Sequence, residues 1–294
     1  MKELNFNLPL GYSVNGVYTR AIKLLKGNAV SEEVFTKKLA ERPNTWIGNV
    51  ISVATKSIGD VPVGEAVRAD YLKTGSVVIP LVVKQMPLAD ANTMLLEIHR
   101  RVWKAVMPKQ QIVCKFCAKS LMINVDLDKV VLDEFNLAKL EGDPEFNAIE
   151  VNLPTGLNMT MWLTENKKTD ELSDLMGVTF NKLIFRVPTL GDAIKNEAHA
   201  SKSVDFWRRI ALDCLVGIQQ VSEDGKVLKE FPTEKFAWLG LKLFNHFDSD
   251  DLQAIREELR DELPVMPFAY YDLCPCDFQR EIPVTIEASG FFSE

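Results

Sequence analysis

The chain has 294 residues, of which 47% are hydrophobic and 26% charged, and this balance excludes an intrinsically disordered protein. The formal net charge is −7 at pH 7, which argues against a nucleic-acid-binding surface, since such surfaces are normally basic. No apolar run approaches the roughly 20 residues that a membrane-spanning helix needs. The first residues do not resemble a secretory signal, so we expect a cytoplasmic protein whose five cysteines stay reduced.

The first half of the chain is expected to alternate strands with helices. Residues 17–25 have a strand-like pattern, and Ser31, followed by two glutamates, is typical of a helix start. Apolar residues at helical spacing predict a helix over residues 46–58. Residues 60–83 are rich in turn signals and contain only short β-like runs, after which Asp90 can cap the next helix.

The second half is expected to repeat this order with clearer helical signals. Residues 157–163 are strand-like, and apolar residues at i, i+3 and i+4 give residues 206–218 one buried helical face. Thr233 caps a short aromatic helix. Asp248 or Asp250 caps a last helix, which has apolar residues on one side and charged residues on the other.

A short motif that occurs twice indicates an internal duplication. Residues 7–11 read Asn-Leu-Pro-Leu-Gly, residues 152–156 read Asn-Leu-Pro-Thr-Gly, and later features of the two halves correspond at a separation of about 160 positions. The sequence therefore predicts an α+β protein of two diverged pseudo-repeats, each mainly helical with a zinc-knuckle-like β-hairpin. The first covers residues 1–133 and the second residues 151–294, with a linker at residues 134–150.

Two cysteine-bearing turns suggest a metal site. The first is Cys114-Lys115-Phe116-Cys117 and the second is Cys274-Pro275-Cys276-Asp277; each follows an apolar residue and precedes a strand-like alternation. Such a turn between two strands is typical of a zinc knuckle, and two knuckles supply the four ligands of a closed tetrahedral site. We predict that Cys114, Cys117, Cys274 and Cys276 bind one structural Zn²⁺, which ties the two halves of the chain together.

The second turn leaves three arrangements open, because its cysteines stand one residue closer than in a standard knuckle. Cys274 and Cys276 both bind the metal, or Cys274 and Asp277 occupy the standard spacing, or this half binds no metal. For the first turn, the alternatives are two reduced cysteines in a plain hairpin and a redox-active dithiol, which normally uses a helix N-terminus to lower the thiol pKa. Cys214 lies on an apolar helical face and is expected to be a core residue.

The sequence lacks the motifs of the common enzyme classes. It contains no G-x-G-x-x-G, Walker A, G-x-S-x-G or H-E-x-x-H pattern. Its three histidines stand at no recognisable spacing from a nucleophile or from a second metal ligand. We therefore expect that the protein is not an enzyme and that it acts by binding.

The order of these features resembles one protein family. The matching pieces are Leu8-Pro9-Leu10-Gly11-Tyr12, Gly16-Val17-Tyr18-Thr19-Arg20, the helix from Asp90 to Arg100, the Cys114-x-x-Cys117 turn, Val125-Asp126-Leu127, Leu153-Pro154-x-Gly156 and the closing Phe291-Phe292 pair. In this order they resemble the baseplate hub assembly chaperones of T-even-type phages and of related contractile injection systems. The resemblance implies a non-enzymatic protein of tail or baseplate assembly that binds hub or spike components, as a chaperone or as a structural subunit. The chain departs from the family pattern in a looser segment at residues 27–33 and in the shortened second cysteine turn.

A zinc-ribbon adaptor that binds nucleic acid is the rival interpretation, and it needs Lys and Arg around both turns. The first turn is surrounded by Lys104, Lys109, Lys115 and Lys119, but the second by Asp272, Asp277 and Glu281. We therefore expect baseplate hub, spike or other tail proteins as partners, and neither nucleic acid nor a membrane. The protein is expected in the cytoplasm during assembly, and in the tail baseplate if it stays in the particle.

Overall fold

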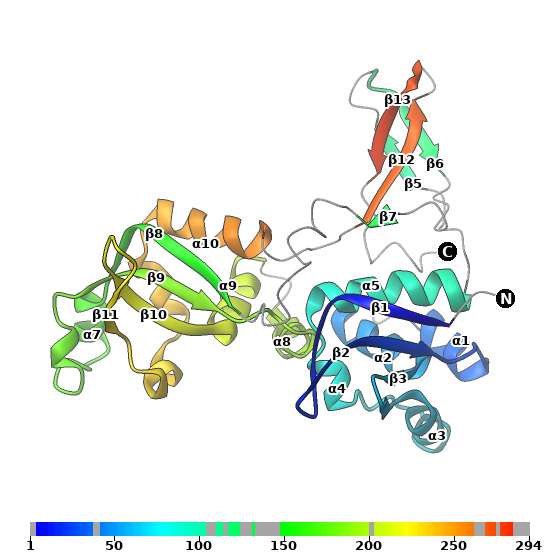
Figure 1. Cartoon of the computed structure of the whole chain (residues 1–294), viewed down its shortest axis with the longest axis horizontal. Coiled ribbons are helices and arrows are strands. Elements are labelled where there is room, and N and C mark those ends of the chain that lie inside the picture. Colours follow the sequence, from blue (N-terminus) through cyan, green and yellow to red (C-terminus); the bar gives the residue numbers. More distant parts are fainter. Residues whose placement is uncertain are drawn as a thin grey trace. The chain divides into compact units, whose positions relative to one another are not determined.

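The structure is a computed structural model that describes residues 4–37, 42–103, 110–113, 117–123, 131–132, 148–199, 203–261, 268–274 and 277–284. The chain divides into two units (Figure 1). Unit 1 comprises Met1–Pro144, Thr189–Ile194 and Pro264–Glu294, and unit 2 comprises Glu145–Pro188 and Lys195–Leu263. Each unit combines helices with a four-stranded antiparallel sheet, which confirms the α+β class.

The main sheet of unit 1 is a meander in chain order. It consists of β1 (Asn5–Val14), β2 (Val17–Leu24), β3 (Thr55–Ile58) and β4 (Val61–Pro62). The two residues Asn15 and Gly16 join β1 to β2, with φ values of 52° and 80°. These are the left-handed conformations of the tight hairpin turn that an Asn-Gly pair favours, so the local sequence sets the register of this hairpin.

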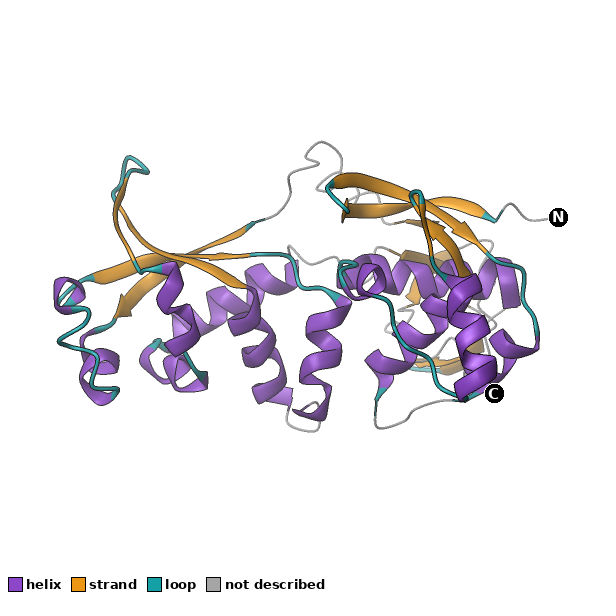
Figure 2. Cartoon of the chain, turned by 90° about the horizontal axis from the view of Figure 1, so that it is seen from below, coloured by secondary structure: helices purple, strands orange, loops and turns teal. Residues whose placement is uncertain are grey.

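Helices lie mainly on one face of this sheet (Figure 2). They are α1 (Ala29–Thr36), α2 (Pro43–Ala54), α3 (Gly64–Thr74), α4 (Leu81–Lys84), α5 (Leu88–Ile98) and the π-helical turn η1 (His99–Trp103) that continues α5. α2 and α5 supply fully buried core side chains such as Val50, Ile51 and Met94. The cap of α1 is Asn28, whose side chain accepts a hydrogen bond from Ser31 N, and not Ser31 as predicted.

Two further predictions for unit 1 hold only in part. The helix expected over residues 46–58 is α2 followed at once by β3, because the chain turns from helix to strand between Ala54 and Thr55. Ile58 fits the helical spacing of the apolar residues before it, but it is buried in the sheet. The region 60–83 contains helix α3, which buries few apolar side chains and therefore has a weak helical pattern.

Unit 2 also has a meander, formed by β8 (Ile149–Asn158), β9 (Thr179–Phe185), β10 (Leu215–Val221) and β11 (Val227–Glu230). Its helical segments are α7 (Thr160–Glu165), η3 (Ser173–Leu175), the end of α8 (Leu190–Asn196), η4 (Glu197–His199), α9 (Ser203–Cys214), η5 (Thr233–Trp238), η6 (Leu241–His246) and α10 (Ser249–Asp261). Large aromatic side chains fill its core, among them Trp162, Phe180 and Phe231.

Three predictions for unit 2 need correction. The helix expected over residues 206–218 is α9 followed at once by β10, the same transition as in unit 1. The strand expected over residues 157–163 ends at Asn158, because the next residues form α7 and bury Trp162. The aromatic helix expected from Thr233 consists of two short 3-10 helices, η5 and η6.

The described part of unit 1 also contains two small sheets. β5 (Gln110–Val113) pairs with β6 (Ser120–Ile123), and β12 (Phe268–Cys274) lies between β13 (Asp277–Val284) and β7 (Val131–Leu132). The closing pair Phe291-Phe292 lies outside the described residues. None of the helices in the described ranges is long and apolar enough to cross a membrane.

Candidate functional site

The first cysteine turn connects two paired strands. β5 and β6 pair antiparallel along their whole length, as the alternation after the turn predicts. Cys117 is half-buried in the connection, and Ala118 beside it has a φ of 55°. Residues other than glycine adopt this left-handed backbone mainly in tight turns. Cys114, the other predicted ligand of this turn, lies outside the described residues.

The second cysteine turn closes the β12–β13 hairpin. Its backbone register places Cys274 opposite Asp277 at the closed end, next to a register shift at Leu273. Cys276 lies outside the described residues. The hairpin predicted around this turn is therefore present, and the choice between Cys276 and Asp277 as the second ligand stays open.

The zinc site itself stays a prediction. Within the described ranges, no group of three or more His, Cys, Asp or Glu side chains is placed to hold a metal ion, but Cys114 and Cys276 lie outside those ranges. β5, β6, β12 and β13 all group with unit 1, so both hairpins belong to the same unit. Cys214 is confirmed as a core residue, since it is fully buried at the end of α9.

A buried carboxylate on α5 forms a well-defined polar site in unit 1. Asp90 is fully buried in the first turn of the helix, and its two oxygens accept hydrogen bonds from the backbone N–H groups of Leu10 (2.9 Å) and Gly11 (2.8 Å). These amides belong to the Leu-Pro-Leu-Gly motif, where the pairing of β1 with β2 shifts between Asn7 and Tyr12. Gly11 supplies the left-handed φ of 77° that this bulge requires. We call residues 8–11 with Asp90 the first anchored turn.

Side chains from β2 enclose the first anchored turn. Arg20 donates a hydrogen bond from Nε to the carbonyl oxygen of Leu8 (2.6 Å), and the Tyr18 hydroxyl donates one to the carbonyl oxygen of Leu10. Burial raises the pKa of Asp90 to about 7, although the two amide N–H groups and the charge of Arg20 act to lower it. The desolvation of this carboxylate is therefore only partly offset by its donors.

Unit 2 contains a similar arrangement around a different carboxylate. Asp251, fully buried in the first turn of α10, accepts hydrogen bonds from the backbone N–H groups of Thr155 (2.9 Å) and Gly156 (3.3 Å). These amides belong to the second copy of the motif, where the pairing of β8 with β9 shifts between Asn152 and Leu157 and Gly156 has a φ of 88°. Both bonds reach Oδ1. We call residues 153–156 with Asp251 the second anchored turn.

The sequence singles out these two regions but gives Asp90 another role. Asp90 is predicted above to cap its helix, and this was wrong: α5 begins after Pro87 without a side-chain cap, and Asp90 binds amides 80 positions earlier. For the last helix, neither Asp248 nor Asp250 makes the long-range contact, which belongs to Asp251. The available signal was that each Leu-Pro-x-Gly motif is matched by an aspartate at the start of a later helix.

Comparisons of the chain with protein-family models, with characterised proteins and with solved structures gave no match. The role of the anchored turns therefore rests on their geometry. Each one holds a bulged edge strand against the first turn of a helix through a carboxylate that is buried from solvent. Such a carboxylate positions backbone, because its oxygens face amide donors of the chain.

Proposed function

We propose that the protein is a non-enzymatic assembly factor of a contractile phage tail or of a related injection apparatus, and that it binds hub or spike components of the baseplate. The proposal rests mainly on the positions in space of the motifs that carry the family resemblance. Leu8, Gly11, Tyr18, Arg20 and Asp90 come from three separate pieces of that series, and their atoms meet at the first anchored turn. Short motifs that build one site together are more specific than the same motifs scattered over a surface.

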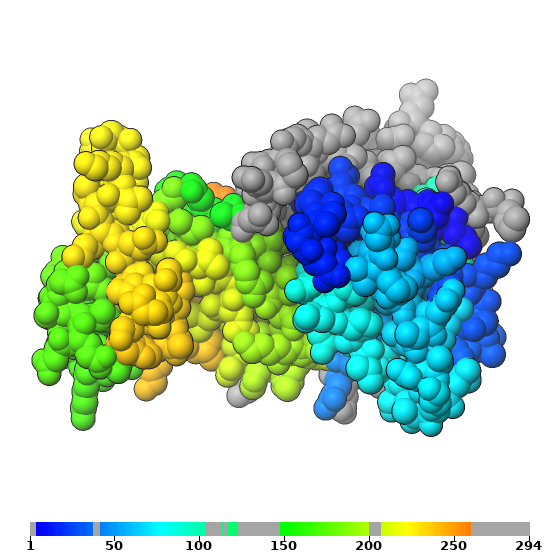
Figure 3. All heavy atoms as spheres, turned by 60° about the horizontal axis from the view of Figure 1, so that its bottom comes forward, coloured from blue at the N-terminus to red at the C-terminus, as the bar shows by residue number. Residues whose placement is uncertain are grey.

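Exposed apolar side chains support a binding role. In unit 1, Leu72, Val78 and Leu81 are 75%, 73% and 69% exposed within one short segment. In unit 2, Val227 and Leu228 are exposed on the β10–β11 hairpin, which projects from the surface of this unit (yellow in Figure 3). Large apolar side chains gathered on a solvent-facing segment are typical of protein–protein contacts.

The proposal includes the predicted duplication of the chain. In both units the second strand of the meander leads into helices, the last of which runs without a loop into the third strand. In both, the first strand carries a bulge that a buried aspartate of a later helix holds. Two copies of one ancestral unit explain these shared features more simply than chance does, and each copy contributes one zinc-knuckle-like hairpin.

The predicted zinc ion belongs to the same proposal, with Cys114, Cys117, Cys274 and Cys276 as ligands, or Asp277 in place of Cys276. Zinc would stabilise hairpins too small to fold alone. Elemental analysis of the purified reduced chain is expected to find zinc, and Cys117→Ser to lower its content strongly. Cys214→Ala, which alters a core cysteine, is the control and is expected to keep the metal. Unchanged zinc content in Cys117→Ser would contradict the site.

Co-expression tests the assembly function directly. The chain is produced together with the hub and spike components encoded by the same source, and complexes are separated by size-exclusion chromatography. We expect co-elution with at least one of these components, and loss of complete baseplates when the gene is deleted. Complete baseplates in the deletion strain would contradict the proposal.

A further inference from the structure

A cluster of arginine and aromatic side chains in unit 2 takes no part in the second anchored turn. Trp207 of α9 packs edge-on against Phe244 of η6, with ring centres 5.3 Å apart. The guanidinium carbon of Arg208 lies 5.9 Å from the Trp207 ring centre and 5.6 Å from that of Phe244, and the guanidinium carbon of Arg256 lies 5.2 Å from Trp207. Contacts of this kind hold a guanidinium group in place while its N–H groups stay available to acceptors.

These arginines have no acidic partner within the part of the chain that the structure describes. Arg208, Arg209 and Arg256 make no hydrogen bond or ion pair there, and the Nε atoms of Arg208 and Arg209 are buried without an acceptor. Asp213, further along α9, already accepts hydrogen bonds from Lys195 and Asn196 at 2.7 Å each. Arg256 is exposed, so an acceptor from another molecule can reach its guanidinium group.

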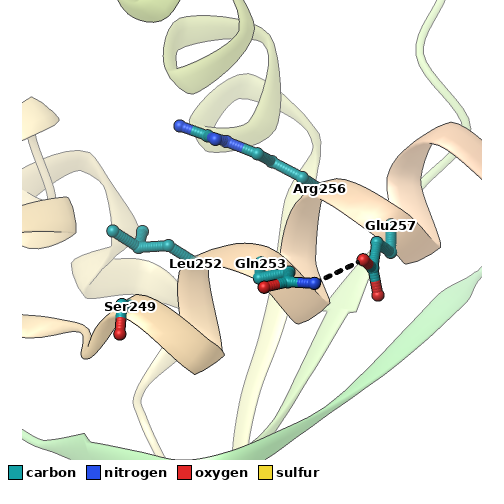
Figure 4. Close-up of a pocket in the computed structure, with 5 residues that line it drawn as sticks. All are labelled: Ser249, Leu252, Gln253, Arg256 and Glu257. Atoms are coloured by element: carbon teal, nitrogen blue, oxygen red, sulfur yellow. Dashed lines mark hydrogen bonds between the residues drawn. The ribbon is translucent and has the colours of Figure 1, made fainter.

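A pocket on one face of α10 adjoins the cluster. It is lined by Ser249, Leu252, Gln253, Arg256 and Glu257 (Figure 4). Gln253 donates a hydrogen bond from Nε2 to Glu257 Oε1 at 2.7 Å, and Arg256 extends away from this bonded pair (Figure 4). No acidic residue stands three or four positions from Arg256, which is the spacing at which charges pair along a helix.

We propose that Arg256 and Arg208 bind carboxylates of an acidic segment of a partner protein, which lies along α10 with Leu252 as an apolar contact. The inference deepens the proposed assembly function, on which it rests, by naming the chemistry of the partner surface. A guanidinium group presents two parallel N–H groups, the geometry that a carboxylate accepts, and the nearby rings limit how far the arginine side chains move. Ser249 supplies a further hydrogen-bonding group at one end of the pocket.

Charge favours an acidic protein segment over nucleic acid as the occupant. Glu257 lines the same pocket as Arg256. A continuous phosphate backbone would meet this acid, whereas a protein segment can place single carboxylates on the arginines and neutral side chains elsewhere. Lasting affinity for a polyanion of uniform charge also needs a larger basic surface than this cluster offers.

Fluorescence anisotropy tests the inference on the full chain, with a labelled peptide in which single glutamates are separated by serine and leucine. We expect binding that weakens as salt is raised, because exposed charges are screened. Arg256→Gln is expected to weaken binding at least about tenfold, and Arg256→Lys to give an intermediate loss, because the charge stays but the planar fork is gone. Lys226→Gln removes the same charge from the exposed β10–β11 turn and is expected to leave binding unchanged.

Three results would overturn the inference: no peptide binding by the native chain, equal losses in Arg256→Gln and Lys226→Gln, or tighter binding of a single-stranded oligonucleotide than of the peptide. Folding of each variant is checked by circular dichroism, and Arg208→Gln supplies a second, independent variant. If the chain forms the hub complex but does not bind the peptide, the proposed acidic partner segment is wrong and the assembly function stands. If the chain binds the peptide but forms no complex with hub or spike components, the assembly function is wrong and the acidic partner segment stands.

Discussion

The two anchored turns use the same backbone device with unequal support. In the first, each oxygen of Asp90 accepts one amide hydrogen bond, at 2.9 and 2.8 Å. In the second, both amide bonds go to Oδ1 of Asp251, at 2.9 and 3.3 Å, and Oδ2 is buried without a hydrogen-bond partner in the described part of the chain. The second carboxylate therefore leaves half of its accepting capacity unused.

The side chains around the two carboxylates also support the first turn more than the second. Arg20 and Tyr18 donate hydrogen bonds to carbonyl oxygens of the first motif, whereas no basic or tyrosine side chain in the described part of the chain donates one to the second motif. A buried carboxylate is stable only when its acceptors are filled and its charge is compensated. The comparison indicates that the first turn is the stronger clamp between strand and helix, and the second turn a weaker relative of it.

Replacing each aspartate with alanine is expected to give the largest changes in stability and tests this comparison directly. Asp90→Ala leaves two buried amide N–H groups without an acceptor and is expected to lower the free energy of unfolding by about 4 kcal/mol. Asp251→Ala is expected to cost about 2 kcal/mol, because it also removes an oxygen that was buried unsatisfied. Urea unfolding measures the loss, and hydrogen exchange of residues 10–11 and 155–156 assigns it to a unit. A larger loss for Asp251→Ala would reverse the ranking.

These long-range contacts are also where sequence reasoning reached its limit. Helices α1, α5 and α10 could be predicted, because capping groups and apolar residues at helical spacing are local signals. The partners of Asp90 lie 79 and 80 positions away and those of Asp251 lie 95 and 96 positions away, and no local pattern encodes them. A carboxylate in the first turn of a helix looks the same in sequence whether it caps that helix or holds a distant strand.

The C-terminal ends of α2 and α9, which run directly into strands, could not be predicted from the sequence for a related reason. Ile51, Ala54 and Ile58 stand at helical spacing, and so do Ala211, Leu215 and Ile218. The same positions suit a buried strand that continues the helix, since both elements face one core. Apolar periodicity over so few residues cannot separate the two. The cysteine hairpins were easier to predict, because alternation and the turn were adjacent in sequence.

Replacing the motif glycines with alanine tests how much room each bulge leaves for a side chain. A Cβ atom at Gly11 would lie 2.5 Å from Arg20 Cγ and 2.7 Å from the Thr19 carbonyl oxygen, and one at Gly156 would lie 2.7 Å from Thr179 Cγ2. We expect Gly11→Ala to lower the free energy of unfolding by about 3 kcal/mol and Gly156→Ala by about 2 kcal/mol. The loss is larger at Gly11 because the added Cβ atom would clash there with the backbone oxygen of Thr19, whereas at Gly156 the nearest atom belongs to a side chain.

The control for the glycine series is Gly16→Ala. Gly16 has a similar φ of 80°, but nothing lies within 4 Å of an added Cβ. Its cost should therefore be the backbone strain alone, about 1 kcal/mol. Thermal unfolding of the three variants separates crowding from strain. Equal losses in all three would mean that the packing at the two bulges contributes nothing.

The pH dependence of stability tests the burial of Asp90. Its pKa is raised to about 7 in the folded protein, against about 4 in an unfolded chain. Between these values the folded state holds the proton more tightly. The free energy of unfolding should therefore fall as pH rises from about 4 to about 7, by at most about 1.4 kcal/mol per pH unit, and level off above.

Asp90→Asn provides the matched comparison for this pH effect, because it keeps the side-chain shape and removes the titration. Urea unfolding of both proteins is measured from acid to mildly alkaline pH, and the contributions of all other groups cancel in the difference. The native chain should lose stability relative to the variant as pH rises. Parallel curves would show that Asp90 keeps its ordinary affinity for protons when the chain folds.

The smallest expected effect concerns the side chain that distinguishes the first turn. Arg20→Gln removes the charge that lowers the pKa of Asp90 and weakens the hydrogen bond from Nε to the Leu8 carbonyl oxygen. Because Arg20 favours the ionised carboxylate, its loss should raise the pKa of Asp90 further and cost about 1 kcal/mol at pH 8. The cost should be smaller at pH 5, where Asp90 is protonated, so the pH dependence separates the two contributions. A loss of equal size at both pH values would assign the whole effect of Arg20 to the hydrogen bond, and the electrostatic difference between the two anchored turns would no longer hold.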